Sequence, residues 1–230
     1  GGIDSSATVS YIKDTGYGPL NTFSLAFDEK PFDESNYQDE AVSSFNTRHR
    51  TFTCTAKDIA EVFPNVVWHS ETPMTRTAPA PMMLLSKLVK NNRFKAVISG
   101  EGSDEILGGY DIFKETVIRR FWASQPESSI RPMLLKRLYP YIPLINNAGV
   151  NALKMFFGYK LEDVENPFYS HLLRWNNSNH IKKHFSAYIK NKLSNYSPSD
   201  ELFLHLPEKF NSWDHLSKAQ WLEITIFMSG

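Results

Sequence analysis

Gly1-Gly2-Ile3-Asp4-Ser5-Ser6 is the first of two short glycine loops in this sequence, and Ser99-Gly100-Glu101-Gly102-Ser103-Asp104-Glu105 is the second. Both loops carry hydroxyls and carboxylates, and each leads into a stretch with helical spacing of apolar residues. The second loop follows the apolar run Lys95–Ile98, which is typical of a strand. Glycine loops at the strand ends of a parallel sheet bind phosphates. The two loops therefore predict one site for a polyphosphate and its metal ion.

Strand-like and helix-like stretches alternate over the first half of the chain. This alternation predicts an α/β fold with a doubly wound parallel sheet, whose ligand crevice lies at the carboxyl ends of the strands. The expected strands cover residues 22–27, 51–55 and 96–98. Ser5 and Ser6 are expected to cap the first helix, Ser35 opens the second, and Thr55 with Asp58 resembles a capping box for the third. A further helix is expected around Leu84–Val89, after an irregular connector forced by Pro73, Pro79 and Pro81.

Strand signals fade beyond Tyr110, and aromatic-rich helical patterns replace them. We expect helices near residues 113–123, 133–138, 148–157, 180–193 and 216–228, with a joint at Tyr139–Pro143. The predicted organisation is an α/β core over residues 1–110 and a helical region of the same domain over residues 111–230.

The composition narrows the classes of partner. Lys plus Arg and Asp plus Glu number 25 each in 230 residues, so the net charge is zero. This balance counts against nucleic acid, because binding its backbone usually requires a basic excess. No apolar stretch approaches the ~20 residues that span a bilayer. The single cysteine, Cys54, excludes an internal disulfide, and we expect it to be a buried, inert thiol in a cytoplasmic protein.

The chemistry of the two loops indicates pyrophosphate release. Asp4 would repel bare phosphate, so a carboxylate there makes sense if it holds Mg²⁺, with Asp104 as a second carboxylate. Neither loop has the lysine of the G-x-x-x-x-G-K-[ST] pattern, which argues against a kinase- or GTPase-like site. A loop without this lysine suits a reaction in which a nucleophile attacks the α-phosphate and pyrophosphate leaves. The alternative for Gly1–Ser6 is an ordinary helix cap.

The two loops resemble a known family. Gly1–Ser6 resembles the end of the pyrophosphate-loop signature S-G-G-x-D-S. Ser99–Glu105, followed by Gly108-Gly109-Tyr110, resembles the S/T-G-E/D-G-x-D-E-x-x-x-G-Y signature of the synthetase domain of glutamine-hydrolysing asparagine synthetases. Phe32–Tyr37 and Arg76–Pro81 are also similar to that family, and the resemblance is continuous to about residue 115. It implies an adenine nucleotide alpha-hydrolase-like fold.

The resemblance also implies a reaction and its residues. L-aspartate would be converted to L-asparagine through β-aspartyl-AMP, with ATP as substrate, Mg²⁺ as cofactor and ammonia from an N-terminal glutaminase domain. Glu101 would be the catalytic carboxylate that accepts a proton from the attacking nitrogen. Arg76 and Glu105 would bind the substrate, and Asp4 and Asp104 the metal ion. The implied ATP-binding residues are Gly1, Gly2, Asp4, Ser5, Leu25, Ser99, Gly100 and Asp104.

Three parts that the resemblance calls for are not in the sequence: a strand and serine before Gly1, the glutaminase domain, and a lysine beyond Met228. We therefore expect a fragment of a longer enzyme that makes little or no asparagine alone, and whose exposed sheet edge favours self-association. The sequence leaves open whether the protein forms a homodimer. The alternatives are a β-lactam-forming synthetase, another adenylating amidotransferase with this loop, or a non-catalytic domain that keeps the fold.

Overall fold

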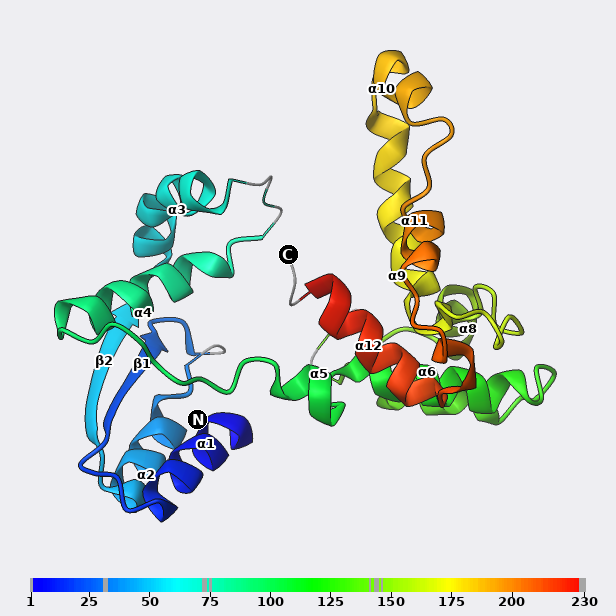
Figure 1. Cartoon of the computed structure of the whole chain (residues 1–230). Helices are drawn as coiled ribbons and strands as arrows, with labels where there is room; N and C mark the ends of the chain where they lie inside the picture. Colours follow the sequence, from blue (N-terminus) through cyan, green and yellow to red (C-terminus); the bar gives the residue numbers. More distant parts are fainter. Residues whose placement is uncertain are drawn as a thin grey trace. The chain divides into compact units, whose positions relative to one another are not determined.

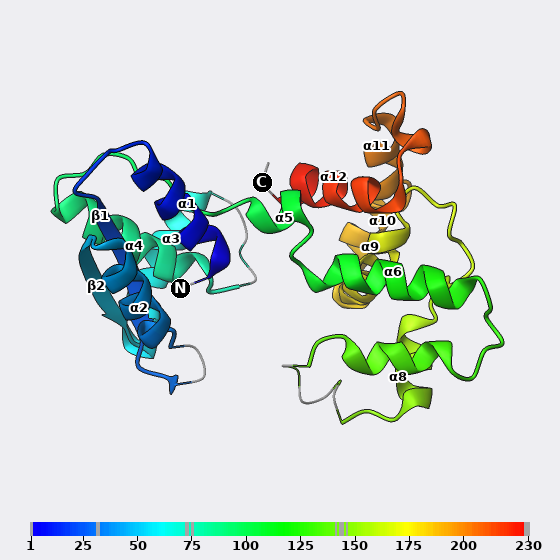
Figure 2. The same cartoon turned by 90° about the horizontal axis from the view of Figure 1, so that it is seen from below.

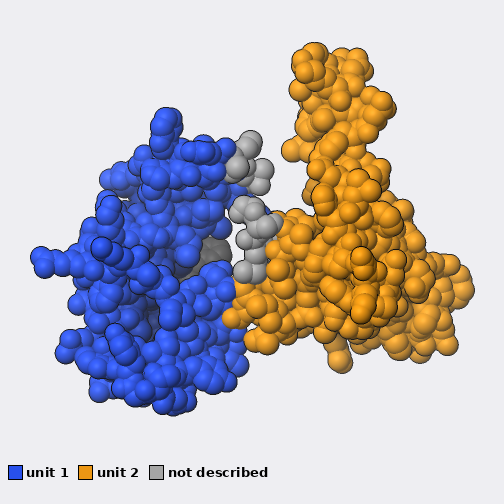
Figure 3. Space-filling view, viewed as in Figure 1, with its two compact units in different colours: residues 1–101 blue, residues 102–230 orange. Residues whose placement is uncertain are grey.

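The computed structural model describes residues 2–30, 33–71, 74, 76–140, 142, 145 and 147–227. The chain forms two compact units, Gly1–Glu101 and Gly102–Gly230 (Figure 3). Several residues used in the predictions lie outside the described ones: Gly1 of the first loop, Phe32, Pro73 of the connector, Tyr141 and Pro143 of the joint, and Met228.

The first unit is built on a two-stranded parallel sheet. Strand β1 (Asn21–Phe27) pairs with β2 (Arg48–Cys54) in a register that joins Asn21 to Arg48 and Phe27 to Cys54. Helix α2 (Ser35–Phe45) connects the two strands, and α4 (Pro79–Asn91) packs against both of them. Figures 1 and 2 show α1 (Ile3–Asp14) beside α2 on one side of the strands and α4 on the other. The prediction of an α/β unit with parallel strands is confirmed for this pair.

The prediction of a strand at residues 96–98 is wrong. The segment from Lys95 to Gly100 forms neither a helix nor a strand, and Val97 and Ile98 are 59% and 75% exposed. A strand is stabilised by backbone hydrogen bonds to a neighbour, and among the described residues the sheet consists of β1 and β2. The apolar composition of residues 96–98 is therefore not sufficient to make them a strand, because no described strand pairs with this segment.

Two helix starts also differ from the predictions. A cap residue keeps an extended backbone, and Gly2 has one (φ −71°, ψ 165°), so α1 begins at Ile3 and Ser5 and Ser6 lie inside its first turn. Helix α4 begins at Pro79 instead of near Leu84. Prolines are tolerated in a first helical turn, where the missing N–H has no intrahelical partner to lose.

Helix α3 (Ala56–Ser70) confirms the predicted capping box. The Asp58 backbone N–H donates to Thr55 Oγ1 at 3.2 Å, and the Thr55 backbone N–H donates to Asp58 Oδ2 at 2.9 Å. The Thr55 hydroxyl also donates to this carboxylate, and these bonds lower the pKa of Asp58. Cys54 precedes the cap and is fully buried, as predicted, and burial raises the pKa of its thiol.

Helices are the only regular secondary structure among the described residues of the second unit, which confirms the prediction of a mainly helical region (Figure 1). The predicted helix at 133–138 is a 3-10 helix, η2 (Arg131–Arg137), whose second residue is Pro132. The predicted helix at 180–193 is divided in two, because Phe185 and Ser186 are extended and Ser186 caps a new start. The elements are α5 (Ser103–Leu107), α6 (Asp111–Ala123), η2, α8 (Val150–Phe157), α9 (Tyr169–Asn179), η3 (His180–His184), α10 (Ala187–Lys192), α11 (Pro198–Leu204), η4 (Phe210–Ser212) and α12 (His215–Phe227).

Three apolar clusters of described residues form the core of the second unit. One surrounds Phe157 and Trp122 between α6, η2 and α8, and another surrounds Phe210 and Leu222 between η4 and α12. The third joins Phe113 of α6 to Ala219 of α12. Arg119 of α6 is also completely buried in this unit. Among the described helices, none combines the length and the apolar character needed to cross a membrane.

Candidate functional site

The first glycine loop leads directly into α1. The Gly2 carbonyl accepts a hydrogen bond from the Ser6 N–H at 3.2 Å, and the Asp4 carbonyl accepts one from Thr8 Oγ1 at 2.9 Å. The Asp4 side chain is half-buried, and no side chain caps the helix start. The first N–H groups of a helix have no intrahelical acceptor and carry a partial positive charge. This helix start can therefore bind an anion.

Gly100 of the second loop lies against the first loop. An ideal Cβ placed on Gly100 would lie 2.9 Å from Asp4 Cβ, 3.1 Å from the Asp4 carbonyl carbon and 3.1 Å from the Ser5 nitrogen. The first distance is shorter than real Cβ atoms show and the other two are unusually tight, so a side chain at this position would require the two backbones to move apart. The predicted convergence of the two loops is therefore found within the first unit, between Gly100 and Asp4–Ser5.

The neighbours of Gly100 remain accessible. The Glu101 N–H donates to Ser99 Oγ at 3.4 Å, and both side chains are exposed. The carboxylate proposed for proton transfer thus lies one residue beyond the contact with Asp4.

Asp104 and Glu105 lie on α5, at the start of the second unit. An ideal Cβ on Gly109 would lie 1.9 Å from Asp104 Oδ1, so the missing side chain of Gly109 makes room for this carboxylate. Glu105 is buried and its Oε1 accepts a hydrogen bond from the Tyr110 hydroxyl at 3.0 Å, while its Oε2 has no hydrogen-bond partner among the described residues. The proximity of Asp104 to Asp4 stays a prediction.

Leu25 and Arg76 are the other predicted site residues. Leu25 lies in β1, and its carbonyl accepts a hydrogen bond from Gln38 Nε2 at 2.8 Å. Arg76 is exposed in the connector before α4. The structure does not bring Arg76 into a described contact with the two loops, so its role also stays a prediction.

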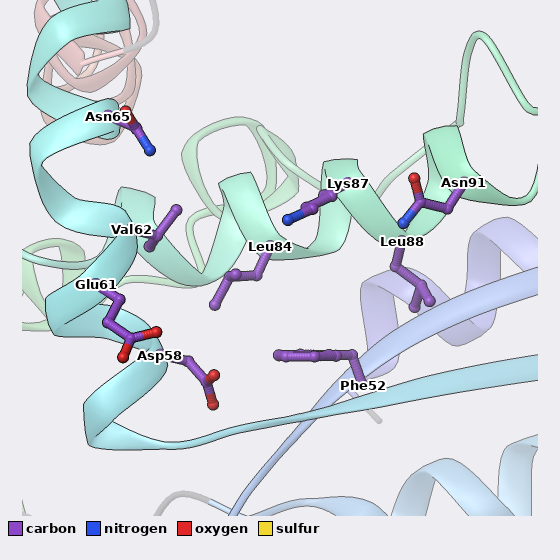
Figure 4. A pocket seen from close by; sticks show the side chains of 9 residues that line it. All are labelled: Phe52, Asp58, Glu61, Val62, Asn65, Leu84, Lys87, Leu88 and Asn91. Atoms are coloured by element: carbon purple, nitrogen blue, oxygen red, sulfur yellow. The ribbon is translucent and has the colours of Figure 1, made fainter.

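The two described cavities lie away from these residues. One of about 390 Å³ opens between α3 and α4, where Asp58 and Glu61 face Lys87 over the ring of Phe52 (Figure 4). The other, of about 220 Å³, lies in the second unit and is lined by Arg120, Lys218 and Asp214 among others. None of the predicted site residues lines either cavity, so neither cavity carries the functional assignment.

The metal prediction rests on two carboxylates. In the part of the chain that the structure describes, no group of three or more His, Cys, Asp or Glu side chains could hold a metal ion. Mg²⁺ in phosphate sites is commonly bound by one or two carboxylates together with phosphate oxygens. Asp4 and Asp104 are carboxylates of this kind, and each is half-buried beside a glycine that leaves its side chain room. Their joint role as metal ligands stays a prediction.

Analysis of the sequence missed two polar groupings. One joins Thr22, Ser24, Gln38 and His49 on the sheet, and the other surrounds Arg119 in the second unit. The first had a partial signal, because the hydroxyls of Thr22 and Ser24 flank Phe23 with the period of a strand. The second had none, since its partners are backbone carbonyls far along the chain.

Comparison with known proteins gives a family model that matches the whole chain and relatives that match parts of it. A family model described as Asparagine synthase matches residues 1–230. The chain is 31% identical over 135 residues to glutamine-hydrolyzing asparagine synthetase 1 of Bacillus subtilis, which is 59% of this chain and 21% of that protein. It is 38% identical over 96 residues to glutamine-hydrolyzing asparagine synthetase 2 of Arabidopsis thaliana, which is 41% of this chain and 16% of that protein.

A third relative is similar in extent. Glutamine-hydrolyzing asparagine synthetase 1 of Lotus japonicus is 36% identical over 124 residues, covering 49% of this chain and 21% of that protein. The chain thus spans about a fifth of the length of the curated relatives that it matches. With Gly100 of the second loop against Asp4 and Ser5 of the first, and the family model matched from end to end, the chain belongs to the asparagine synthase family.

Proposed function

We propose that this chain carries the ATP-dependent synthetase site that amidates L-aspartate to L-asparagine, with ammonia derived from glutamine. The observation that carries the proposal is the contact of Gly100, in the second signature loop, with Asp4 and Ser5 of the first. The family match and the names of the relatives support the same reaction. An adenine nucleotide alpha-hydrolase-like fold, with a larger sheet than the described strand pair, is part of this proposal.

The first loop would hold the pyrophosphate. The free N–H groups at the start of α1 attract anionic oxygens, and Gly1, Gly2 and Ser5 leave space or add a hydroxyl donor. Asp4 and Asp104 would hold Mg²⁺, which neutralises phosphate charge when bound. Ser99, Gly100 and the backbone of Leu25 would contact the nucleotide.

The reaction has two steps. In the first, an oxygen of the aspartate side-chain carboxylate bonds to the α-phosphorus of ATP, and the bond from this phosphorus to pyrophosphate breaks. In the second, ammonia bonds to the activated carbonyl carbon and the bond to AMP breaks. The attacking nitrogen becomes cationic and must lose a proton, which the Glu101 carboxylate would accept. Arg76 and Glu105 would bind aspartate, and the open Oε2 of Glu105 is available to a donor of the substrate.

The test is exchange of labelled pyrophosphate into ATP by the full-length protein. We expect exchange that requires both aspartate and Mg²⁺, because labelled pyrophosphate enters ATP only when the adenylate has formed and the first step then runs in reverse. Adding ammonia should then yield asparagine. A non-catalytic scaffold would show no magnesium-dependent binding of ATP analogues in calorimetry, and ring closure of a different acid without uptake of ammonia would favour a β-lactam-forming synthetase.

Gly109→Ala is expected to lower the exchange rate about 10-fold. Its Cβ would overlap Asp104 Oδ1, so the carboxylate has to rotate away from its position. Steady-state exchange assays of Gly109→Ala, Asp104→Asn and the double variant give the measurement. If the alanine acts through Asp104, it adds little to Asp104→Asn. Additive losses would contradict this reason.

A further inference from the structure

The two faces of the β1–β2 sheet differ in polarity. Phe23, Leu25 and Phe52 alternate with polar residues, and Phe52 lines the cleft beneath α4 (Figure 4). The residues between them carry hydroxyls or an imidazole and are bonded to one another and to Gln38 of α2. The sheet therefore turns the face that carries Phe23, Leu25 and Phe52, together with Arg50 over the Phe23 ring, toward α4, and a hydrogen-bonded polar face toward α2.

The polar face holds one continuous chain of hydrogen bonds. Thr47 Oγ1 lies 2.9 Å from Thr22 Oγ1, which lies 2.9 Å from His49 Nδ1. His49 Nε2 lies 2.9 Å from Ser24 Oγ, and Ser24 Oγ lies 2.7 Å from Gln38 Oε1. The chain ends where Gln38 Nε2 meets the Leu25 carbonyl oxygen at 2.8 Å.

The direction of the bonds from His49 to Leu25 follows from this last contact. A carbonyl oxygen only accepts, so the Gln38 amide must donate to Leu25 and present its own oxygen to Ser24. The single hydroxyl hydrogen of Ser24 is then used, and Ser24 accepts from His49 Nε2–H. These hydrogen bonds therefore require a hydrogen on His49 Nε2. In the neutral ring with this hydrogen, Nδ1 accepts from the Thr22 hydroxyl.

The surroundings of His49 favour this neutral state. The ring is half-buried between the two strands and α2, and burial lowers its pKa, while Asp39 raises it by a smaller amount. The partly buried hydrogen bonds are shielded from competition with water, which makes the loss of a donor costly.

We infer that Gln38 and His49 are positioning residues that fix the Leu25 carbonyl for recognition of the adenine base. This inference rests on the proposed function, in which the Leu25 backbone meets the base. A carbonyl oxygen accepts from the 6-amino group of adenine and faces an acceptor in guanine, whose 6-position is an oxygen. Gln38 holds the Leu25 peptide through one lone pair and leaves the other for the base. His49 and Ser24 in turn hold the Gln38 amide in the required orientation.

The test is the nucleotide preference of Gln38→Glu in the full-length protein. A glutamate has nearly the same shape but no hydrogen to donate, so it loses the bond to Leu25 and keeps the acceptor for Ser24. We expect KM for ATP to rise about 10-fold and the preference for ATP over GTP to fall by a similar factor, since a broken hydrogen bond to a shielded group has about this effect. KM for aspartate and kcat at saturating ATP should stay unchanged.

A pair of His49 variants provides a second, independent test. His49→Gln keeps a donor for Ser24 and should retain most of the nucleotide preference, whereas His49→Phe has no donor and should lose it about as Gln38→Glu does. Thr51→Val is the matched control, because Thr51 Oγ1 lies 3.2 Å from Ser24 Oγ but is not part of the hydrogen-bond series that runs from Thr47 to Leu25. Circular dichroism checks that each variant is folded.

The outcomes separate this inference from the proposed function. Calorimetric titration with MgATP and MgGTP measures the preference even if aspartate-dependent exchange is absent, and absent exchange in the wild type would overturn only the proposed reaction. Variants that lower the melting temperature but keep the wild-type ratio of ATP to GTP affinity would show a purely structural network and overturn the inference. Equal binding of both nucleotides by the wild type would also overturn it.

Discussion

Replacing Gly100 with alanine is expected to lower aspartate-dependent exchange of pyrophosphate into ATP by at least about 100-fold, while the protein stays folded. The added Cβ would meet Asp4 Cβ, the Asp4 carbonyl carbon and the Ser5 nitrogen at 2.9–3.1 Å. Two of these atoms are backbone, so no side-chain rotation relieves the overlap. The two loops have to separate, and displacements of about 1 Å at a reacting centre have effects of this size.

The measurement needs a glycine control. Gly149 has no heavy atom within 4 Å of its ideal Cβ and precedes α8 with an extended backbone, so Gly149→Ala should retain wild-type exchange. Circular dichroism and thermal unfolding of both variants separate a local displacement from unfolding. Full exchange by Gly100→Ala would show that the contact between the loops is not needed for the reaction, and would remove the observation on which the proposed function rests.

Elements defined by neighbouring residues could be predicted from the sequence. The capping box depends on Thr55 and Asp58 within one helical turn, and both of its hydrogen bonds are present. Strands β1 and β2 and most of the helices follow from local spacing of apolar residues. Fine boundaries were harder, because Pro79 and Gly2 start helices by backbone conformation and not by side-chain capping.

Elements that depend on distant partners could not be predicted in this way. Residues 96–98 have the composition of a strand, but strand formation depends on a neighbour that composition does not specify. The contact of Gly100 with Asp4 and Ser5 agrees with the expectation from the two loops, although neither loop follows a described strand. The bond from Gln38 to Leu25 was not, because it depends on how α2 is oriented over the strands.

The polar centre of the second unit is a further case of distant partners, and it shows how a charge is held inside a helical unit. Arg119 Nε donates to the Phe157 carbonyl at 3.0 Å, and Nη2 donates to the Tyr159 carbonyl at 2.6 Å. Its guanidinium carbon lies 4.6 Å from the centre of the Tyr169 ring, and Nη1 lies 3.9 Å from Glu115 Oε1. One side chain from α6 therefore holds the C-terminal end of α8 and the start of α9.

The Glu115 carboxylate completes this group. Its Oε2 accepts from the Tyr139 hydroxyl at 2.7 Å and lies 3.3 Å from Arg174 Nη2. Glu115 is 2% exposed. The pKa of the neighbouring Tyr139 hydroxyl is raised, mainly because this hydroxyl is itself buried. Because Glu115 is shared by two arginines, removing Arg119 takes away part of its compensating charge and leaves backbone carbonyls without donors.

Arg119→Met is accordingly expected to lower the free energy of unfolding by about 3–5 kcal/mol, the usual cost of breaking a buried ion pair from one side. The methionine fills much of the volume but donates no hydrogen bond and leaves Glu115 less neutralised. Urea unfolding followed by tryptophan fluorescence measures this loss, since four of the five tryptophans lie in the second unit. Lys114→Met on the same helix is the control, because Lys114 is exposed and its pair with Asp111 should contribute less than about 1 kcal/mol. Equal losses in the two variants would mean that the buried arginine fills space without organising the unit.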